Sequence, residues 1–257
     1  MQRRGIAFLL ALAIAAAPAA AAGSSLLDRI ATRGFLRVGS TGDYRPFSYE
    51  DPRTRQFSGF DIDMARSLAA ALGVRLAIVR TSWPGLMADL RARRFDLAMG
   101  GISVTGERRR AALFSRPYLT DGKVAIARCA EGGRFIGLAA IDRPQVRVVV
   151  NPGGTNERFV RDRLRRAAII VHPDNATIFD EIAGRRADVM ITDASEARLQ
   201  QRLHPGLCAI RPDRPFNLLE KAYLLPQDAA FKAAVDRWLG RAMADGELAR
   251  TAARWLY

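Results

Sequence analysis

The sequence predicts an α/β fold of two lobes joined by a hinge. Strand-like and helix-like segments alternate in two separate blocks, one before residue 100 and one after residue 145. Residues 121–127 (DGKVAIA) lead out of the first block, and residues 218–226 (LLEKAYLLP) lead back to it. No low-complexity linker separates the blocks, so two crossover strands are expected to form the hinge. A cleft between two lobes is a common place for a small-molecule site.

The first block reads as strand, helix, strand, helix, strand. Its predicted elements are a strand at 35–41, a helix at 60–73 that ends on glycine, a strand at 75–81, a helix at 84–93 that begins with proline, and a strand at 96–100. Apolar residues at helical spacing alternate here with short apolar runs, which is typical of α/β units.

The second block repeats this alternation. Its predicted elements are strands at 146–151, 168–173 and 187–192 and helices at 155–164, 175–186 and from 193 to about His204. The chain closes with a helical region over 228–255 that breaks near Gly246.

These patterns predict the domain boundaries. The first lobe is expected to span residues 23–123 and to be completed by residues 218–257, whose helices return to it. The second lobe is expected to span residues 124–217. Residues 1–22 lie outside both lobes.

The amino-terminal segment predicts export. Arg3 and Arg4 precede an apolar stretch at 6–17 and a small-residue run, PAAAAG, which is the pattern of a secretory signal peptide over 1–22 cleaved after Ala22. No later stretch approaches the ~18 uninterrupted apolar residues of a membrane span. The mature chain is therefore expected to be an exported, soluble protein without a membrane anchor.

Charge and cysteine content narrow the function classes. The formal net charge is +14 at pH 7, but the arginines are spread over many predicted helix faces and no nucleic-acid motif occurs. We therefore expect no nucleic-acid partner and a positive field that gathers anionic small molecules. Cys129 and Cys208 are the two cysteines, and an oxidising compartment favours a disulfide between them. No cysteine or histidine spacing indicates a metal site.

One group of candidate site residues follows the strand at 96–100, in MGGISVTGERRR (99–110). Gly101 allows close backbone approach, Ser103 offers a hydroxyl, and Arg108 could hold a carboxylate through two parallel hydrogen bonds. The alternative is that Thr105 caps a helix and the arginines form a solvated face. Spacing alone favours none of the three arginines at 108–110.

A second group follows the strand at 146–151, in VVVNPGGTNERF (148–159). Glycines between a strand and a helix present free amide donors, an arrangement that suits an anion. The segment lacks GK[ST] and is not a nucleotide P-loop. The alternative is a tight turn with Thr155 as the helix N-cap.

A third group lies in ADVMITDASEARL (187–199). Asp193 is a favoured N-cap residue, and Glu196 three places later completes an acidic relative of the capping box. The alternative is that the two carboxylates have separate chemical roles, since open α/β sheets place ligands where strands end and helices begin.

Two aromatic residues also follow predicted strands. Tyr44 lies in STGDYRPFSY and Trp83 in TSWPGLM, both at carboxyl ends where a ring can line a cleft. The alternative for each is a place in the hydrophobic core.

Together these segments resemble the amino-acid-binding periplasmic solute-binding proteins, whose fold is the two-lobed type II fold. The stretch GFDIDMA (59–65) resembles a helix start of their first lobe. In that family a serine or threonine and the arginine of a Glu-Arg pair hold the ligand carboxylate, and the resemblance implies this role for Ser103 and Arg108. An aspartate in the second lobe holds the ligand amine, which implies Asp193.

The segments STGDYRPFSY, TSWPGLM, NPGGTNERF, HPDNATIF and TDASEARLQQRLHP resemble more closely the cyclohexadienyl dehydratases, exported periplasmic enzymes built on this scaffold. The resemblance implies decarboxylative dehydration of prephenate to phenylpyruvate and of L-arogenate to L-phenylalanine, without a cofactor. It implies Glu196 as general acid and Asn151 as a supporting amide. The residues implied to bind the dicarboxylate substrate are Tyr44, Trp83, Gly101, Ser103, Arg108, Lys123, Gly154, Thr155 and Asp193. Related enzymes could also self-associate as homo-oligomers.

The chemistry makes a demand on Glu196, because a general acid must be protonated at working pH. A helix start favours the carboxylate, whereas burial, the charge of Asp193 and the substrate carboxylates favour the neutral acid. We expect the second set of effects to prevail with substrate bound.

The leading alternative function is a periplasmic protein that delivers an amino acid to an ABC-type permease, which gives Glu196 and Asn151 no role. A weaker alternative is a sensor lobe that docks onto a receptor.

Overall fold

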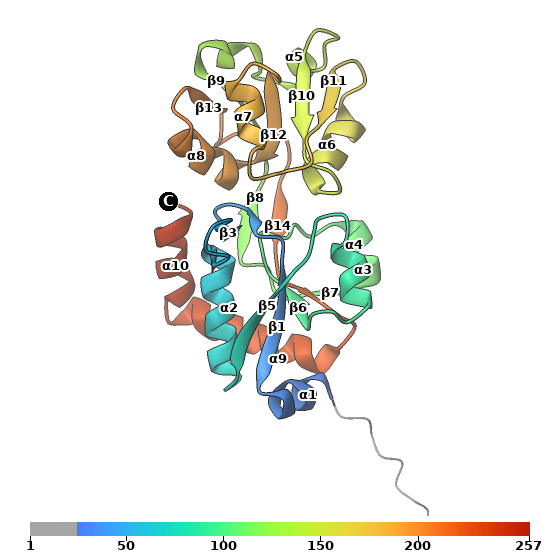
Figure 1. The fold of residues 1–257 in the computed structure, drawn as a ribbon, viewed down its shortest axis with the longest axis vertical. Coiled ribbons are helices and arrows are strands. Elements are labelled where there is room, and N and C mark those ends of the chain that lie inside the picture. Colours follow the sequence, from blue (N-terminus) through green and yellow to red (C-terminus); the bar gives the residue numbers. More distant parts are fainter. Residues whose placement is uncertain (1–24) are drawn as a thin grey trace, which may run out of the picture.

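The computed structural model describes residues 25–257, which fold into two α/β lobes placed end to end (Figure 1). The predicted signal peptide at 1–22 lies outside the described residues. Each lobe is built around its own five-stranded sheet, so the predicted two-lobed α/β class is confirmed. Among residues 25–257 no helix has both the length and the apolar character needed to cross a membrane.

The sheet of the first lobe has the strand order β5-β1-β6-β15-β7. The first three of these strands come from the first sequence block and run parallel to one another. The fourth, β15, comes from the returning chain and is antiparallel to both of its neighbours. The strands are β1 (Phe35–Ser40), β5 (Arg75–Arg80), β6 (Leu97–Ala98), β7 (Leu113–Phe114) and β15 (Leu224–Leu225).

The sheet of the second lobe has the order β11-β10-β12-β9-β13. Its first three strands are parallel, and β9 pairs antiparallel with both β12 and β13. The strands are β9 (Lys123–Arg128), β10 (Arg147–Val150), β11 (Ala168–Val171), β12 (Val189–Asp193) and β13 (Leu207–Ile210).

Two short antiparallel strands connect the lobes. They are β8 (Leu119–Asp121) and β14 (Leu219–Lys221), which pair with each other and cross between the two sheets (Figure 1). A further small sheet is formed by β2 (Asp43–Tyr44), β3 (Ser48–Glu50) and β4 (Phe57–Ser58), and it lies on the first lobe. The sequence patterns did not predict this small sheet, because its strands are two or three residues long.

Helices cover both faces of each sheet. The first lobe carries α1 (Leu26–Arg33), α2 (Phe60–Ala71), α3 (Leu86–Arg91), α4 (Gly106–Ala111), α9 (Ala229–Ala244) and α10 (Glu247–Trp255). The second lobe carries a 3-10 helix at Cys129–Arg134 and the helices α5 (Leu138–Ile141), α6 (Thr155–Arg163), α7 (Ile178–Ala183) and α8 (Ala194–Leu203). The predicted break in the last helical region lies at Gly246, where φ is +77°.

Strand periodicity divides the second lobe into two cores. Val148 and Val150 pack with Phe159 of α6 on one face of the sheet, whereas Val149 packs with Ile178 and Phe179 of α7 on the other. Successive side chains of a strand point to opposite faces, so a fully apolar strand such as β10 requires helices on both sides. Both faces are therefore closed, and ligand access is confined to the strand ends.

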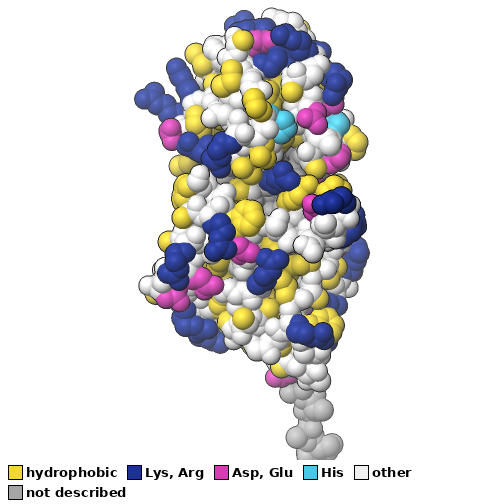
Figure 2. Space-filling view, turned by 60° about the vertical axis from the view of Figure 1, so that its left-hand side comes forward, with side chains coloured by type: hydrophobic (Ala, Val, Ile, Leu, Met, Phe, Trp, Pro, Cys, Tyr) yellow, Lys and Arg dark blue, Asp and Glu magenta, His cyan; other side chains and the backbone are white. Residues whose placement is uncertain are grey.

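A disulfide joins Cys129 and Cys208 in the second lobe. Cys208 lies in β13 and Cys129 directly follows β9, the neighbouring strand. The face of the molecule in Figure 2 carries its lysines and arginines in separate groups over both lobes, without one continuous basic stripe.

Candidate active site

The two lobes meet around a small cavity of about 20 Å³, which we call the cleft cavity. It is lined from the first lobe by Tyr44, Trp83, Gly101, Ser103 and Arg108 and from the second lobe by Asn151, Gly154, Thr155, Asn156 and Asp193. Nine of the eleven candidate site residues from the sequence are in this set. The other two, Lys123 and Glu196, lie behind the lining.

Sheet topology explains this convergence. Asp193 is the last residue of β12, Asn151 directly follows β10, and Gly101 and Ser103 follow β6. Each of these strands is parallel to a neighbour in its sheet, and the carboxyl ends of parallel strands meet at one edge. The two sheets face each other with these edges, so residues from distant parts of the chain surround one cavity.

Asp193 is held by two buried ammonium groups. The Lys123 Nζ lies 2.7 Å from Oδ1, and the Lys221 Nζ lies 2.5 Å from Oδ2. The Tyr44 hydroxyl also donates to Oδ2. Although burial raises the pKa of Asp193, the charges of Lys123 and Lys221 hold it well below its usual range. Asp193 occupies the predicted N-cap position of α8, but its side chain makes no capping hydrogen bond, so the prediction is correct for the position and wrong for the bond.

Lys221 was not predicted from the sequence. It lies in β14 with no exposed surface, and its Nζ donates to the Gly101 carbonyl at 2.9 Å and to the Ser103 hydroxyl at 3.0 Å. The segment LLEKAYLLP was interpreted only as a returning strand. Its signal was a lysine in a mostly apolar segment, because a buried lysine needs acceptors to offset its desolvation.

Glu196 lies in the first turn of α8 and is only 1% exposed. The Thr192 hydroxyl donates to Oε2, whereas Oε1 has no hydrogen-bond partner among residues 25–257. Burial raises the pKa of Glu196 to about 8; the Thr192 hydrogen bond opposes this, and the charge of Asp193 adds to it. The carboxyl group is therefore mostly neutral at pH 7 in this closed arrangement, three residues from an ionised aspartate.

A chain of buried polar groups connects Lys123 to Glu196. The Lys123 Nζ donates to the Thr155 hydroxyl at 3.0 Å and to the Asn156 Oδ1, and burial lowers the pKa of Lys123. The Asn156 amide donates to the Thr192 Oγ1 at 3.0 Å, and Thr192 in turn donates to Glu196. The N-cap of α6 is Gly154, so the interpretation of Thr155 as a cap is wrong.

The polar chain also contains a residue that the sequence patterns did not single out. Asn156 is 5% exposed and contacts Lys123, Thr192 and, at 3.5 Å, Asn151. It follows Thr155 in the segment NPGGTNERF and lies in the first turn of α6, on the side of the helix that is buried. The sequence pattern alone did not indicate this orientation.

The structure distinguishes the three arginines at 108–110. Arg108 is 7% exposed, and its guanidinium donates to the Ser103 carbonyl at 3.0 Å. Burial, with a smaller effect of the Arg158 charge, lowers the pKa of Arg108 to about 10, so it stays charged at neutral pH. Arg109 is exposed and pairs with Glu220, and Arg110 is also exposed. Thr105 caps α4 by accepting from the Arg108 amide, so its predicted alternative role is confirmed.

Aromatic rings form one wall of the cleft cavity. Tyr44 is 4% exposed, packs edge-on against Trp83 at 5.5 Å, and stacks on Phe47 at 5.4 Å between ring centroids. Gly101 has φ +69°, and a Cβ there would lie 2.6 Å from the Phe47 and Tyr44 rings. A glycine is therefore required for the rings and the backbone to approach so closely.

The donor set of the site is cationic and amide-rich. Within residues 25–257 no group of three or more histidine, cysteine, aspartate or glutamate side chains is arranged to hold a metal ion. The polar groups that face the cavity are suited to an organic anion.

Comparison with known proteins agrees with this geometry. Residues 36–257 match the model of the bacterial extracellular solute-binding proteins, family 3. The chain is 54% identical over 250 residues to a cyclohexadienyl dehydratase from Pseudomonas aeruginosa, covering 96% of this chain and 92% of that protein. It is 24% identical to the lysine/arginine/ornithine-binding periplasmic protein of Escherichia coli over 86% of each chain.

Solved structures of reconstructed ancestors are also similar. An ancestral amino acid-binding protein, described as a precursor of cyclohexadienyl dehydratase, has a TM-score of 0.85 and 32% identity over 91% of this chain and 100% of its own. An ancestral cyclohexadienyl dehydratase has a TM-score of 0.57 and 50% identity over 91% of this chain and 97% of its own. The chain therefore belongs to the bacterial extracellular solute-binding proteins of family 3 and, within that family, to the cyclohexadienyl dehydratase group of lyases.

Proposed function

We propose that this chain converts prephenate to phenylpyruvate and L-arogenate to L-phenylalanine, with Glu196 as the proton donor. The observation that carries the proposal is a buried carboxyl group with its pKa raised to about 8, placed beside a cleft that cations surround. A protein that only captures amino acids has no use for a neutral buried acid in this position. The 54% identity to a cyclohexadienyl dehydratase supports the same reaction.

The cations hold the substrate carboxylates. Among residues 25–257 the Arg108 guanidinium makes one hydrogen bond, to the Ser103 carbonyl, and its planar group has further donors for a carboxylate. Lys123 and Lys221 neutralise Asp193 in the closed arrangement, and they supply additional positive charge to a dianion. The Trp83 and Tyr44 rings pack against the cyclohexadienyl ring, and Asp193 receives the ammonium group when arogenate is bound.

The polar chain determines which oxygen of Glu196 carries the proton. Because the Asn156 amide donates to the Thr192 Oγ1, the Thr192 hydroxyl hydrogen is free to point at Glu196. The Oε2 atom then accepts, as a carbonyl oxygen does, and the acid proton resides on Oε1. This is the oxygen without another partner in residues 25–257.

The reaction balances with one proton. The bond between the ring and its carboxylate breaks to release carbon dioxide, and that electron pair enters the ring as it becomes aromatic. The C–O bond to the ring hydroxyl breaks, and the departing oxygen takes the Glu196 proton to form water. Glu196 is left as a carboxylate and regains a proton from solvent when the lobes part. A positioned general acid contributes roughly 10²–10⁴-fold to such a step.

Opening and closing of the lobes is part of this cycle. The cleft cavity of about 20 Å³ has room for little more than one water molecule, so a ring with two carboxylates enters only after the lobes separate. Closure then excludes water and orients the substrate. We place the reaction in the periplasm, after the leader at 1–22 is removed.

The direct test is to add prephenate to the purified mature chain near pH 7 and to follow phenylpyruvate. We expect turnover in the wild type and in the control Glu247→Gln. For Glu196→Gln we expect kcat to fall by at least 100-fold, because the amide of glutamine cannot act as the proton donor. Binding of prephenate without product by the wild type would support solute capture instead. Full activity in Glu196→Gln would remove Glu196 from the mechanism.

A further inference from the structure

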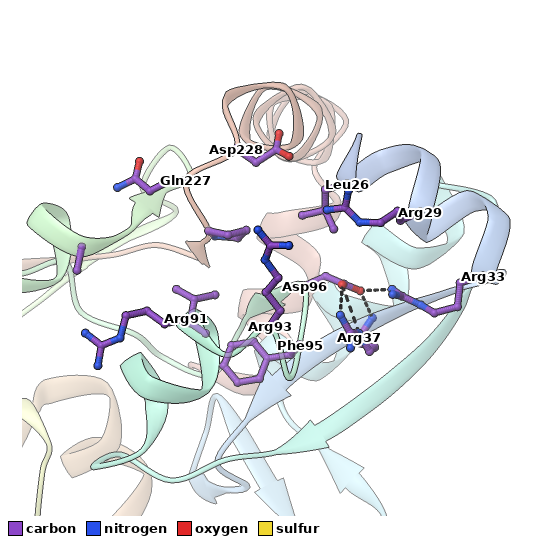
Figure 3. A pocket seen from close by; sticks show the side chains of 13 residues that line it. Leu26, Arg29, Arg33, Arg37, Arg91, Arg93, Phe95, Asp96, Gln227 and Asp228 are labelled. Atoms are coloured by element: carbon purple, nitrogen blue, oxygen red, sulfur yellow. Dashed lines mark hydrogen bonds and ion pairs between the residues drawn. The ribbon is translucent and has the colours of Figure 1, made fainter. Parts of the chain in front are cut away.

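A second cavity lies at the opposite end of the first lobe from the cleft. It has a volume of about 290 Å³ and is enclosed by α1, the start of β1, the turn after α3 and the turn before α9 (Figure 3). Arg29, Arg33, Arg37, Arg91 and Arg93 line it, and we call it the arginine pocket. It faces the amino-terminal ends of the same strands whose carboxyl ends carry the cleft residues.

The pocket gathers more positive charge than its own carboxylates neutralise. The lining contains five arginines and two carboxylates, those of Asp96 and Asp228. Asp96 is fully buried and already engaged, because Arg33 and Arg37 both pair with it and the Arg37 amide donates to it at 2.8 Å. Asp228 caps α9 through the Phe231 amide at 2.8 Å. Among residues 25–257 Arg93 pairs with neither carboxylate.

Arg93 is the arginine best placed to receive a ligand. It follows α3 with a left-handed backbone, φ +55°, and Figure 3 shows its side chain extending into the pocket toward Leu26. Within residues 25–257 the Arg93 guanidinium has no ion-pair or hydrogen-bond partner. Like charges gathered around one concave space raise the local concentration of anions.

The rest of the lining is apolar. Leu26, Leu90 and Phe95, each less than 9% exposed, and Pro226 contribute side chains to the pocket. A volume of about 290 Å³ lies at the lower end of the range for small-molecule sites, which combine apolar walls with a few polar groups. An anion with an apolar body fits this lining better than a bare inorganic ion.

We propose that the arginine pocket is a second binding site, independent of the cleft, for a small carboxylate that carries an apolar group of about one ring. The carboxylate contacts the Arg93 guanidinium, and the apolar group lies against Leu26, Leu90 and Phe95. Arg33 and Arg37 share one carboxylate, that of Asp96, so the three side chains together add a net positive charge to the pocket.

Phenylacetate is a suitable probe, and calorimetric titration of the full mature chain is the measurement. The cleft also attracts aromatic carboxylates, so the titration is done in Arg108→Met, which removes the predicted carboxylate grip there. We expect one site in Arg108→Met, and at least a tenfold weaker affinity when Arg93→Gln is added, because a charge-assisted hydrogen bond is lost. Arg202→Gln, which removes an exposed arginine of the second lobe, is the charge-matched control and should leave the affinity unchanged.

Two comparisons test the chemical class. The neutral analogue 2-phenylethanol and inorganic phosphate should each bind at least tenfold more weakly than phenylacetate. The proposal is overturned if Arg93→Gln binds phenylacetate as tightly as its Arg108→Met parent, if no site remains in that parent, or if phosphate binds as well as phenylacetate. Because the test is made without the cleft arginine, its failure leaves the proposed dehydratase reaction untouched.

Discussion

At the scale of single residues, two carboxyl groups three positions apart are held in opposite charge states. Asp193 lies between two lysine ammonium groups, whereas Glu196 is buried and, within residues 25–257, has no cation in contact and accepts only from the Thr192 hydroxyl. Contact with cations outweighs the burial of Asp193, and burial prevails for Glu196. The two carboxyl groups therefore differ in pKa because their neighbouring side chains differ.

The raised pKa of Glu196 predicts a pH-dependent cost to stability. Between its ordinary value of 4.5 and about 8 the folded chain holds a proton that the unfolded chain releases, so this residue lowers the free energy of unfolding as the pH rises through that window. At about 1.4 kcal/mol per pKa unit, the limit is near 5 kcal/mol. Glu196→Gln should therefore be more stable than wild type at pH 8.5 and similar to it at pH 4.

Urea denaturation at both pH values measures this difference. Glu247→Gln, in a less buried position of α10, is the control for the substitution itself. An equal effect of Glu196→Gln at both pH values would mean that the carboxyl group titrates normally in the folded chain.

At the scale of elements, most of the fold could be predicted from the sequence, because periodicity and glycine or proline boundaries are local signals. The strands at 35–41, 75–81 and 168–173 begin at the residues where β1, β5 and β11 begin. The small sheet from β2 to β4 could not be predicted in this way, since its pairing is non-local and its strands are too short to show a period.

Site residues could be predicted where they end a strand, as Asp193 does, or directly follow one, as Asn151 does. Lys221 and Asn156 were missed for a different reason. Lys221 acts from a connecting strand, and Asn156 acts through other side chains, so neither position has a local pattern. Residue roles that depend on the packing of one element against another need the three-dimensional arrangement.

The polar chain from α6 to β12 gives an element-scale prediction. Asn156→Leu removes the donor to Thr192, and Thr192→Val removes the donor to Glu196. Either change removes the hydrogen bonding that fixes the position of the Glu196 proton, so we expect each variant to lower kcat by roughly tenfold or more. Because both act on the same proton donor, the double variant should lose little more than the worse single variant. Steady-state kinetics with prephenate measure this, and strictly multiplicative losses would show that the two residues act independently.

At the scale of the whole molecule, the lobes are in contact across the cleft in this structure. The Asn175 amide donates to the Asp43 carbonyl at 2.8 Å, and Arg158 pairs with Glu107. Gly153, with φ +76°, lies so close to Pro84 that a Cβ would be 2.7 Å from it. These contacts join the two lobes directly, in addition to the connecting strands β8 and β14.

The disulfide gives a prediction for one lobe alone. Cys129 and Cys208 are separated by 79 residues, and closing a loop of that length stabilises a fold by about 4.5 kcal/mol on the chain-entropy model. Replacing both cysteines with serine should lower the unfolding temperature of the second lobe and leave kcat nearly unchanged at 25 °C. Calorimetry with and without a reductant checks this. No change in the thermal transition would mean that the bond contributes little to stability.

The central claim is that Glu196 is a neutral acid inside the closed cleft. The most direct measurement is a titration of the side-chain carboxyl ¹³C resonances of glutamate, with the resonance of residue 196 assigned through Glu196→Gln and the cleft closed by an unreactive cyclohexadienyl or aromatic dicarboxylate. We expect a pKa of about 8 or above for this group, because the ligand carboxylates also favour the neutral acid. A titration midpoint near the ordinary value of 4.5 would contradict it.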